Sequence, residues 1–538
     1  MIRYRSTAVS TKGMVASSHP LASLSGLRVL MDGGNAFDAA IATNATLNVT
    51  QPHVCGIGGD AFYLLYSRRK GRVESINASG RSSHNASIDF FNDKGLTDIP
   101  SRGILAAINV PGCVAGWFEL HNRYGSYPIA RLLRDAIEYA EKGFPISHQL
   151  SGSISNAFRL FQKETEWRRV YTPNGSAPKP GSVLVQPDLA WSLRLIAEKG
   201  RSAFYEGEIA SRIVNSMKGH GGIIDSEDLS ACSADWEEPI SSEYRGFRIY
   251  ETAPNSQAIT ALFAFNLLKK FDLPRISNSS AEYFQIMLES CKIAYEYRDR
   301  YLTDPNDMKI STSELFQLAS SEKEFSRVRQ KIGNSSQEVL PLSDNSKEDG
   351  DTTYYCVADE EGNCVSSIQS LYFGFGSGFI PERTGIVLQN RGSYFSLDEN
   401  HHNVLRPRKR TFHTLCASLT TSNDEPYLLF GSMGGDVQPQ IHQQVISSIL
   451  DYATDIQQAI EDPRWAMTGT IYDRRKSISL ESRFDADLVT QLKNLGYEIT
   501  MEDELWPTTG HAQGIILSKE RVLLGGADPR GDGAALGY

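Results

Sequence analysis

Long hydrophobic runs are absent from this sequence. No stretch of its 538 residues reaches the roughly 18 consecutive apolar residues of a membrane-spanning helix. The first twenty residues also lack the apolar segment of a secretory signal peptide. We therefore expect a protein of the cytoplasm that is not inserted in a membrane.

Cysteine and basic charge are scarce as well. The seven cysteines are odd in number and scattered, without a C-x-x-C pair, which favours reduced thiols over a disulfide framework. Acidic residues outnumber basic ones, 64 to 54, and a negative surface disfavours nucleic acid or an anionic membrane as partner. No group of ligating residues has metal-site spacing, and no dinucleotide-binding fingerprint is supported by its surroundings. We predict neither metal nor cofactor.

The apolar pattern predicts helices and strands in the first hundred residues. Leucines recur at helical spacing over residues 21–30, and Asn35 reads as the N-cap of a second helix. Residues 60–67 and 73–76 have the composition of strands. Residues 112–330 are mostly helical in pattern.

The pattern changes after this helical region. Residues 333–351 are polar and turn-rich, as in a flexible connector. Strands are predicted directly afterwards at 352–357 and 364–371, and another at 427–430. The last leads through a glycine-rich turn into a helix at 437–450. Two strand-rich zones flanked by helices predict a layered α/β or α+β domain.

Thr352 stands where the polar connector meets the first of these strands. A threonine at a strand start ordinarily reflects β-propensity, so it is weak evidence for catalysis on its own. A series of short motifs runs along the chain: GGNAFDAA (33–40), VPGCVAG (110–116), YLTDP (301–305), TTYY (352–355), FGSG (375–378), GSMGG (431–435) and DPR (528–530) before a terminal Gly-Tyr. In this order they resemble the γ-glutamyltransferase family over nearly the full length. The resemblance implies a layered α+β fold, the αββα sandwich of the N-terminal-nucleophile hydrolases.

The resemblance implies that the chain cuts itself between Asp351 and Thr352, and that Thr352 is the nucleophile, with Thr353 supporting it. Attack of the threonine hydroxyl on the preceding carbonyl would give an ester that water opens. The freed α-amine, with an ordinary pKa of ~7.7–8.0, could then act as the base that a hydroxyl nucleophile needs. Residues 1–351, ending in the connector 333–351, and residues 352–538 would form one structural domain.

Stabilisation of the oxyanion is expected from a glycine pair. Backbone N–H groups suit this role, and Gly434 and Gly435 lie in the matching motif. The alternative is an ordinary strand-to-helix turn. Ser370 aligns with a supporting hydroxyl beside the nucleophile, which is a threonine in the family.

The residues that would read the substrate depart from the family. Where the family binds a carboxylate with an arginine, this chain has Ser79, with Arg81 two residues on. The family's serine pair becomes His413 and Thr414. The remaining departures lie on the side that binds the α-amine: Tyr394 replaces an acidic residue, Arg391 an amide or acid, and Tyr372 an asparagine.

These changes of charge favour the acylase branch of the family, which accepts acyl groups such as glutaryl that have a carboxylate and no amine. Hydrolysis or transfer of γ-glutamyl groups is the competing reading, and an uncut, non-enzymatic binding scaffold is the third. The expected partners are a small-molecule amide, water or an amine acceptor, and the chain's own two fragments. Self-association into a homo-oligomer is left open.

Overall fold

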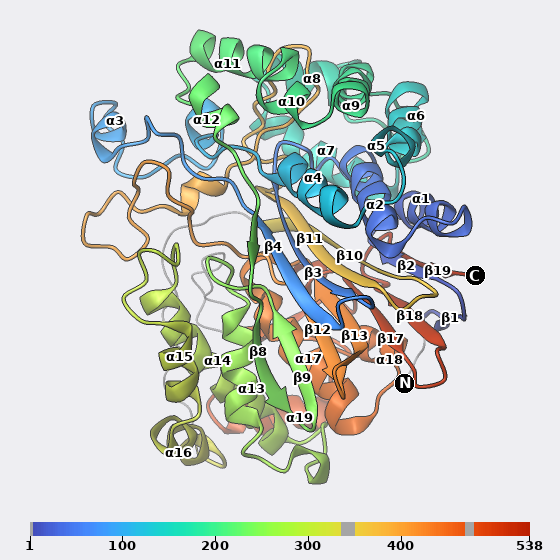
Figure 1. Ribbon diagram of the computed structural model, residues 1–538. Helices are drawn as coiled ribbons and strands as arrows, with labels where there is room; N and C mark the ends of the chain where they lie inside the picture. The colour runs from blue at the N-terminus through green and yellow to red at the C-terminus, as the bar shows by residue number, and fades with distance from the viewer. Residues whose placement is uncertain (1–3, 335–349, 468–477) are drawn as a thin grey trace.

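The computed structural model describes residues 4–334, 350–467 and 478–538. Two antiparallel seven-stranded sheets lie face to face between two layers of helices (Figure 1). The first sheet has the order β19 (Ala534–Gly537), β2 (Met14–Ser17), β10 (Gly350–Ala358), β11 (Cys364–Phe373), β3 (Asp60–Ser67), β4 (Arg72–Ala78) and β7 (Asp235–Glu237). The second has the order β1 (Ala8–Ser10), β18 (Leu523–Ala527), β17 (Ala512–Leu517), β13 (Glu425–Ser432), β12 (Ser418–Ser422), β9 (Phe247–Glu251) and β8 (Ile240–Tyr244).

Two smaller sheets lie outside this sandwich. One has the order β14 (Trp465–Met467), β15 (Ile478–Glu481) and β16 (Ile499–Glu502). The other pairs β5 (Phe144–Pro145) with β6 (Val183–Leu184).

Each large sheet is covered by its own set of helices (Figure 1). The layer over the first sheet contains α1 (Pro20–Met31), α2 (Ala36–Thr50), α4 (Cys113–Tyr124), α5 (Ile129–Leu132), α6 (Arg134–Lys142), α7 (His148–Leu160), α8 (Thr165–Tyr171), α9 (Pro187–Lys199), α10 (Arg201–Tyr205), α11 (Glu208–His220) and α12 (Ser226–Ser230). The short helix α3 (Ile88–Asn92) packs in a separate small cluster with Phe395 and Leu405. The layer over the second contains α13 (Ile259–Leu268), α14 (Ala281–Tyr301), α15 (Thr312–Ala319), α16 (Glu322–Lys331), α17 (Gln438–Tyr452), α18 (Ile456–Glu461) and α19 (Ala486–Asn494). The predicted layered α+β fold is confirmed.

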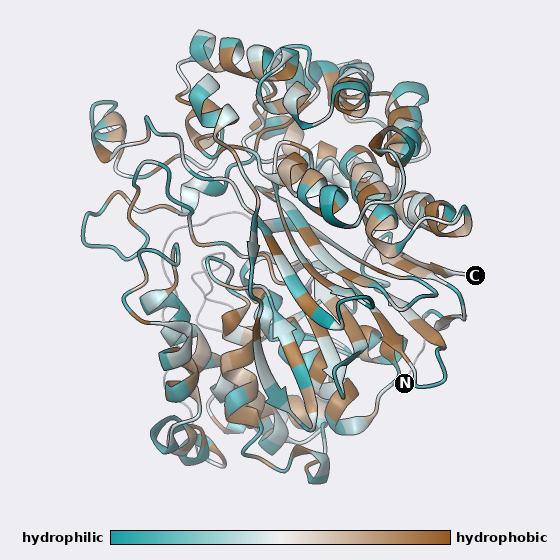
Figure 2. Ribbon diagram, viewed as in Figure 1, coloured by the Kyte–Doolittle hydropathy of each residue, from teal (hydrophilic) through white to brown (hydrophobic). Residues whose placement is uncertain are grey.

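Buried apolar side chains hold the layers together. One cluster fills the space between the sheets and includes Phe62, Leu64, Tyr354, Leu419 and Leu429. Larger clusters join each sheet to its helices. Figure 2 shows the strands largely in brown and white, whereas the helices carry both brown and teal residues, as expected for helices with one buried face.

The local predictions hold for most elements. Asn35 caps α2, because its side chain accepts hydrogen bonds from two backbone N–H groups of the first turn. The predicted strand pair around residue 360 is β10 and β11, and the glycine-rich turn leads from β13 into α17. All seven cysteines are free. Among the described residues no helix combines the length and the apolar character that crossing a bilayer requires.

One boundary of the predicted connector is wrong. Gly350 and Asp351 already belong to β10, because Asp351 is paired with Tyr372 of β11. The central part of the connector, residues 335–349, lies outside the described residues. The predicted cut site, the bond between Asp351 and Thr352, therefore lies within strand β10 and not in a loop.

Candidate active site

The pairing of β10 with β11 contains a β-bulge at the predicted nucleophile, with the extra residue on β11. Asp351 pairs with Tyr372 and Thr353 with Gln369, so the two residues between those partners lie opposite Thr352 alone. A bulge bends a strand locally and re-aims its side chains. Thr352 is buried, with 2% of its surface exposed. The uncut chain thus holds this threonine inside the protein.

Ser370 contacts the carbonyl that precedes Thr352. Its Oγ donates a hydrogen bond to the carbonyl oxygen of Asp351 at 2.7 Å. The same Oγ accepts hydrogen bonds from the backbone N–H of Tyr372 at 2.7 Å and from Nη2 of Arg391 at 3.2 Å. Because a hydroxyl has one hydrogen and two lone pairs, both acceptor positions are filled and the hydrogen is directed at the carbonyl.

The backbone of Tyr372 adopts a left-handed conformation, with φ of +88°. This conformation is rare for a bulky residue, and such strain is concentrated at functional sites. Here it accompanies the turn of the Tyr372 N–H back onto Ser370.

Arg391 is a buried cation beside this carbonyl. It begins the short helix η3 (Arg391–Tyr394) and is 1% exposed. Its Nη1 donates to Oγ1 of Thr414 at 2.8 Å, and its guanidinium lies 4.2 Å from the ring centroid of Tyr372. The rings of Tyr372 and Tyr394 are 4.7 Å apart. We call Tyr372, Arg391, Tyr394 and Thr414 the Arg391 cluster.

The glycine-rich turn contacts strand β10. Gly434 and Gly435 have φ of +124° and +51°, and the turn continues as η4 (Gly435–Val437), which contacts β10. Within the described part of the chain, neither glycine N–H donates a hydrogen bond. N–H groups that donate to no protein acceptor are one feature that an oxyanion site needs, and the role of this turn stays a prediction.

Two bridges tie the turn to the Arg391 cluster. Nε2 of Gln257 donates to the carbonyl oxygens of Thr414 and Gly435, both at 2.9 Å. The hydroxyl of Tyr394 donates to Oδ2 of Asp436 at 2.5 Å, and Asp436 also pairs with Arg298 at 2.9 Å. The Asp351 carbonyl that precedes Thr352, Ser370, the Arg391 cluster and the glycine turn are therefore joined by hydrogen bonds.

His413 belongs to a buried pair at the edge of this site. Its Nε2 lies 3.1 Å from Oδ2 of Asp60. The other oxygen of Asp60, Oδ1, accepts hydrogen bonds from the Gly80 N–H and the Gln389 side chain. Burial raises the pKa of Asp60 to about 6, against the opposing effect of these donors and of the Arg391 charge. Burial lowers the pKa of His413 well below its usual value, so the ring is neutral. His413 supplies no positive charge to a substrate.

Arg81 does not join the site. Its side chain is 38% exposed and lies 3.5 Å from Asp235 and 3.6 Å from Asp304. Ser79, at the position of the family's arginine, donates to Asn77 at 2.6 Å and is buried. Arg391 is therefore the arginine that the structure brings next to Ser370 and Thr414.

Thr353 faces a different set of polar groups. Its hydroxyl contacts the hydroxyl of Ser18 and donates to Oε1 of Gln51 at 3.3 Å. These contacts fix the strand immediately after Thr352, which fits the predicted supporting role.

One group in the described residues could place three ligating atoms together. His84, Asp225 and Asp228 have such atoms within 4.8 Å of one another. His84 is hydrogen-bonded to Asp228, and Asp225 caps α12, so contacts within the protein already account for the group. The expectation of no metal stays a prediction.

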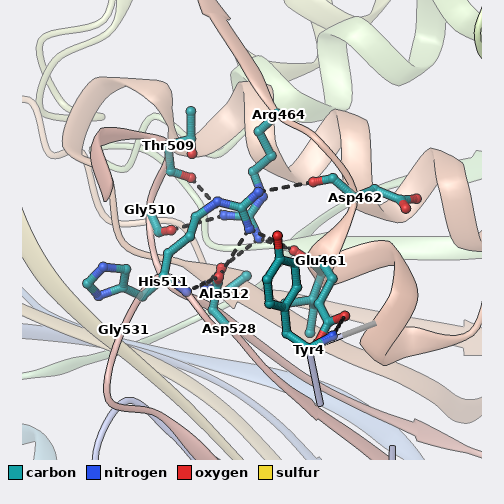
Figure 3. Close-up of polar contacts among 12 residues, drawn as sticks. Tyr4, Glu461, Asp462, Arg464, Thr509, Gly510, His511, Ala512, Asp528 and Gly531 are labelled. Atoms are coloured by element: carbon teal, nitrogen blue, oxygen red, sulfur yellow. Dashed lines mark hydrogen bonds and ion pairs between the residues drawn. The ribbon is translucent and has the colours of Figure 1, made fainter. Parts of the chain in front are cut away.

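A buried arginine, Arg464, binds the segment that packs on the glycine turn. Arg464 donates to the carbonyl oxygens of Thr509 and Gly510 and pairs with Asp528 at 2.7 Å (Figure 3). The segment it holds packs on the turn, because the Met433 N–H donates to the His511 carbonyl at 3.4 Å. Burial alone would raise the pKa of Asp528, but the charges of Arg464 and its neighbours hold it below the ordinary value.

Replacing Arg464 with methionine is expected to lower the stability by about 3–5 kcal/mol, because it leaves the Asp528 charge buried without this partner. Thermal melting would measure the loss. Arg275→Met is the matched control, since Arg275 forms an exposed pair whose contribution should be below about 1 kcal/mol. Equal melting temperatures for Arg464→Met and Arg275→Met would contradict the stabilising role of Arg464.

The lowered pKa of Asp528 also predicts a pH dependence of the wild-type protein. The stability that the Arg464–Asp528 pair contributes is present above about pH 4 and is lost as the pH falls further.

Several residues of the site were not among those predicted. Gln257, Asp60, Asp436 and Arg298 connect its parts, yet none stands in a position that a short motif marks as catalytic. The sequence does mark Asp60, because it is a charged residue at the start of the apolar strand β3. Gln257 likewise precedes the largely apolar helix α13.

A sequence model of the γ-glutamyltranspeptidase family matches residues 22–538. The chain is 42% identical to the glutathione hydrolase-like YwrD proenzyme of Bacillus subtilis (strain 168), over 99% of both chains. It is 34% identical to the oxamate amidohydrolase proenzyme of Klebsiella pneumoniae, over 99% of this chain and all of that one. The crystal structure of cephalosporin acylase from Bacillus halodurans superposes with a TM-score of 0.92 at 36% identity, covering 100% of this chain and 98% of the other.

The sandwich and its relatives define an enzyme of the N-terminal-nucleophile amidohydrolase class. The chain belongs to the γ-glutamyltranspeptidase family. The relatives at 42% and 34% identity are both named as proenzymes.

Proposed function

We propose that this enzyme cuts itself between Asp351 and Thr352 and then uses Thr352 to cleave amides whose acyl group carries a carboxylate but no amine. The observation that carries the proposal is the contact chain from the Asp351 carbonyl through Ser370 to the buried Arg391. The relatives are named a glutathione hydrolase-like proenzyme, an oxamate amidohydrolase proenzyme and a cephalosporin acylase. These names support amide cleavage as the reaction and leave the acyl group to be argued.

Self-cleavage begins with attack of the Thr352 hydroxyl on the Asp351 carbonyl carbon. The negative charge that develops on the carbonyl oxygen is stabilised by the Ser370 hydroxyl, whose hydrogen is already directed at it at 2.7 Å. The carbon–nitrogen bond of the peptide breaks, the nitrogen takes up a proton, and an ester remains. Water hydrolyses the ester and leaves a carboxylate on Asp351 and a free α-amine on Thr352.

After self-cleavage, the Thr352 hydroxyl attacks the carbonyl carbon of the substrate amide. The α-amine of Thr352 accepts its proton, which is feasible near neutral pH for a group with an ordinary pKa of ~7.7–8.0. The substrate oxyanion lies against the N–H groups of Gly434 and Gly435, and the amine leaves with a proton. Water, or an amine acceptor in a transfer reaction, releases the acyl group. Since Thr352 is 2% exposed in the uncut chain, cleavage has to come first.

The charges in the site support a carboxylate without an amine. Arg391 offers a planar guanidinium suited to a carboxylate. A substrate ammonium would meet this like charge, and the acid nearest to Tyr394, Asp436, is already paired with Arg298. Tyr394 itself carries no negative charge to receive an ammonium.

A glutaryl anilide is therefore expected to be cleaved with at least about tenfold higher kcat/KM than the γ-glutamyl anilide, because one misplaced charge costs at least ~1.4 kcal/mol at such a site. The two compounds have the same chain length and differ only in the α-amino group. Side-by-side kinetics on the cut enzyme would measure the ratio. Equal or better turnover of the γ-glutamyl compound would instead support a glutathione-type hydrolase or transferase.

A further inference from the structure

Gln257 is a wholly buried glutamine with both of its donor hydrogens in use. It lies in the turn between β9 and α13, where its backbone N–H donates to the His413 carbonyl at 2.8 Å. Its Nε2 donates to the carbonyl oxygens of Thr414 and Gly435, both at 2.9 Å, and its Oε1 accepts from Nη1 of Arg298 at 2.8 Å. A flipped amide would direct oxygen at two carbonyl oxygens and hydrogens at a guanidinium. The amide therefore has one orientation.

Arg298 is itself held in place by an acid of the glycine turn. It is buried, and the nitrogen that bonds Gln257 also lies 2.9 Å from Oδ1 of Asp436. Its Nε donates to Asp299 at 2.6 Å. From the same helix, α14, the Tyr295 hydroxyl donates to the carbonyl oxygen of Asp436. Helix α14 thus fixes both the turn and the amide that binds it.

The second hydrogen of the Gln257 amide ends at a residue that is also fixed. The Thr414 hydroxyl accepts from Nη1 of Arg391 at 2.8 Å, and Arg391 is bound to Ser370 as well. Gln257 is therefore supported on one side by Arg298 and on the other by Thr414, and the Gly435 carbonyl is attached between these two supports.

The Gly435 carbonyl is the point at which Gln257 acts on the turn. Gly435 has φ of +51° and no Cβ, so its own side chain does nothing to restrict rotation of the backbone. The N–H and the C=O of one residue are attached to the same Cα, and fixing the C=O limits the directions in which the N–H can point. An oxyanion donor acts only if it is aimed at the position that the oxyanion will occupy.

We propose, on the basis of the function proposed above, that Gln257 is a positioning residue of the amide-cleaving reaction. It fixes the Gly435 carbonyl so that the N–H groups of Gly434 and Gly435 point at the substrate oxyanion. It does not touch the substrate, since it is wholly buried and both of its donor hydrogens are bound within the protein.

The test replaces Gln257 with methionine, which has a similar length and lacks the amide donors. In the cut enzyme kcat is expected to fall about tenfold to hundredfold, the scale of a displacement of about 1 Å in a group that acts on the transition state. KM should change by less than about threefold, because an interaction made only in the transition state lowers kcat and kcat/KM equally. Both are measured with the best anilide, whichever of the glutaryl and γ-glutamyl compounds the wild-type enzyme cleaves faster.

The boronic acid analogue of the same acyl group gives a second readout. The Thr352 hydroxyl oxygen bonds to boron, the hydroxyl proton passes to the α-amine, and the tetrahedral boron carries the negative charge of an oxyanion-like adduct. Such analogues of the transition state depend on the oxyanion donors. The affinity for the boronic acid is expected to fall by the same factor as kcat. The affinity for the free carboxylic acid, which forms no adduct, should change by less than about threefold.

Gln186→Met is the matched control. Gln186 is also buried, and its Nε2 donates to the Val49 carbonyl at 2.8 Å in the helical layer over the first sheet. Its loss leaves a buried carbonyl without this donor, so the melting temperature should fall while kcat stays unchanged.

Gln257→Glu is the second variant, and it decides the question if Gln257→Met does not fold. It has nearly the same shape as the wild-type side chain and keeps an acceptor for Arg298. An ionised carboxyl has no hydrogen for the carbonyls of Thr414 and Gly435, so the same loss of kcat is expected.

Failure of this role is distinguishable from failure of the proposed function. A wild-type chain that stays uncut, or that is cut and hydrolyses neither anilide, overturns both. An active wild-type enzyme with folded, cut Gln257 variants of unchanged kcat overturns only the role of Gln257, and so does a loss of kcat that is matched by a loss of affinity for the free acid. A folded Gln257→Met chain that is not cut also contradicts it, because Ser370 and not the turn contacts the Asp351 carbonyl.

Discussion

Replacing Thr352 with alanine is expected to leave one uncut chain of 538 residues, whereas the wild-type protein should yield fragments of residues 1–351 and 352–538. The reason is that the hydroxyl of Thr352 is the attacking group in the proposed cleavage, and the Asp351 carbonyl is already polarised by Ser370 at 2.7 Å. Alanine removes the attacking group but keeps the strand. A denaturing gel with N-terminal sequencing of the smaller fragment would measure the outcome.

Two neighbouring variants control for nonspecific effects. Thr353→Ala removes a hydroxyl that contacts Ser18 and Gln51, and it should still be cut, because that hydroxyl does not attack. Thr352→Ser keeps a hydroxyl and should also be cut. If the alanine variant were cut at the same bond, a protease and not Thr352 would be responsible, and the mechanism would be wrong.

Local interactions made most of the fold predictable. Asn35 caps its helix through its own side chain, and the strand-forming composition of β10 and β11 is visible in the sequence itself. The boundary of the connector was wrong because its last residues are polar, so composition favours a loop. Asp351 is held in the strand by Tyr372 and Ser370, which are about twenty residues away, and short-range patterns do not contain that information.

Candidate site residues were named only where the chain aligns with a motif of the family. Thr352, Ser370, Gly434, Gly435 and Arg391 were named in this way, and their roles stay predictions. The structure places Ser370 in contact with the Asp351 carbonyl and with Arg391. The position of Arg81 was not predictable, because its partners Asp235 and Asp304 come from distant segments. The bridge made by Gln257, between Thr414 and Gly435, has the same origin in long-range packing.

Replacing Gly434 with alanine is expected to lower kcat by ~10²–10³, the effect of losing one oxyanion donor. Gly434 has φ of +124°, which side-chain-bearing residues rarely adopt, and an added Cβ would lie 2.9 Å from Cγ2 of Val437. The turn must move, and its N–H groups then point away from the substrate oxyanion. Self-cleavage should persist, because in the uncut chain the Asp351 carbonyl is served by Ser370.

The prediction for Gly434→Ala has two parts, because kcat for the substrate should fall while self-cleavage should persist. Gly71→Ala is the matched control: Gly71 also has a positive φ, +62°, but no atom lies within 4 Å of an added Cβ, so backbone strain is introduced far from the site and kcat should not change. Fragment formation on a gel and kcat for the best anilide would be measured for both variants, with melting temperatures to verify folding. An unchanged kcat in a folded, cut Gly434→Ala enzyme would mean that the turn is only structural. Loss of self-cleavage together with kcat would mean that one set of donors stabilises both oxyanions, and that the hydrogen bond from Ser370 is not sufficient for the first.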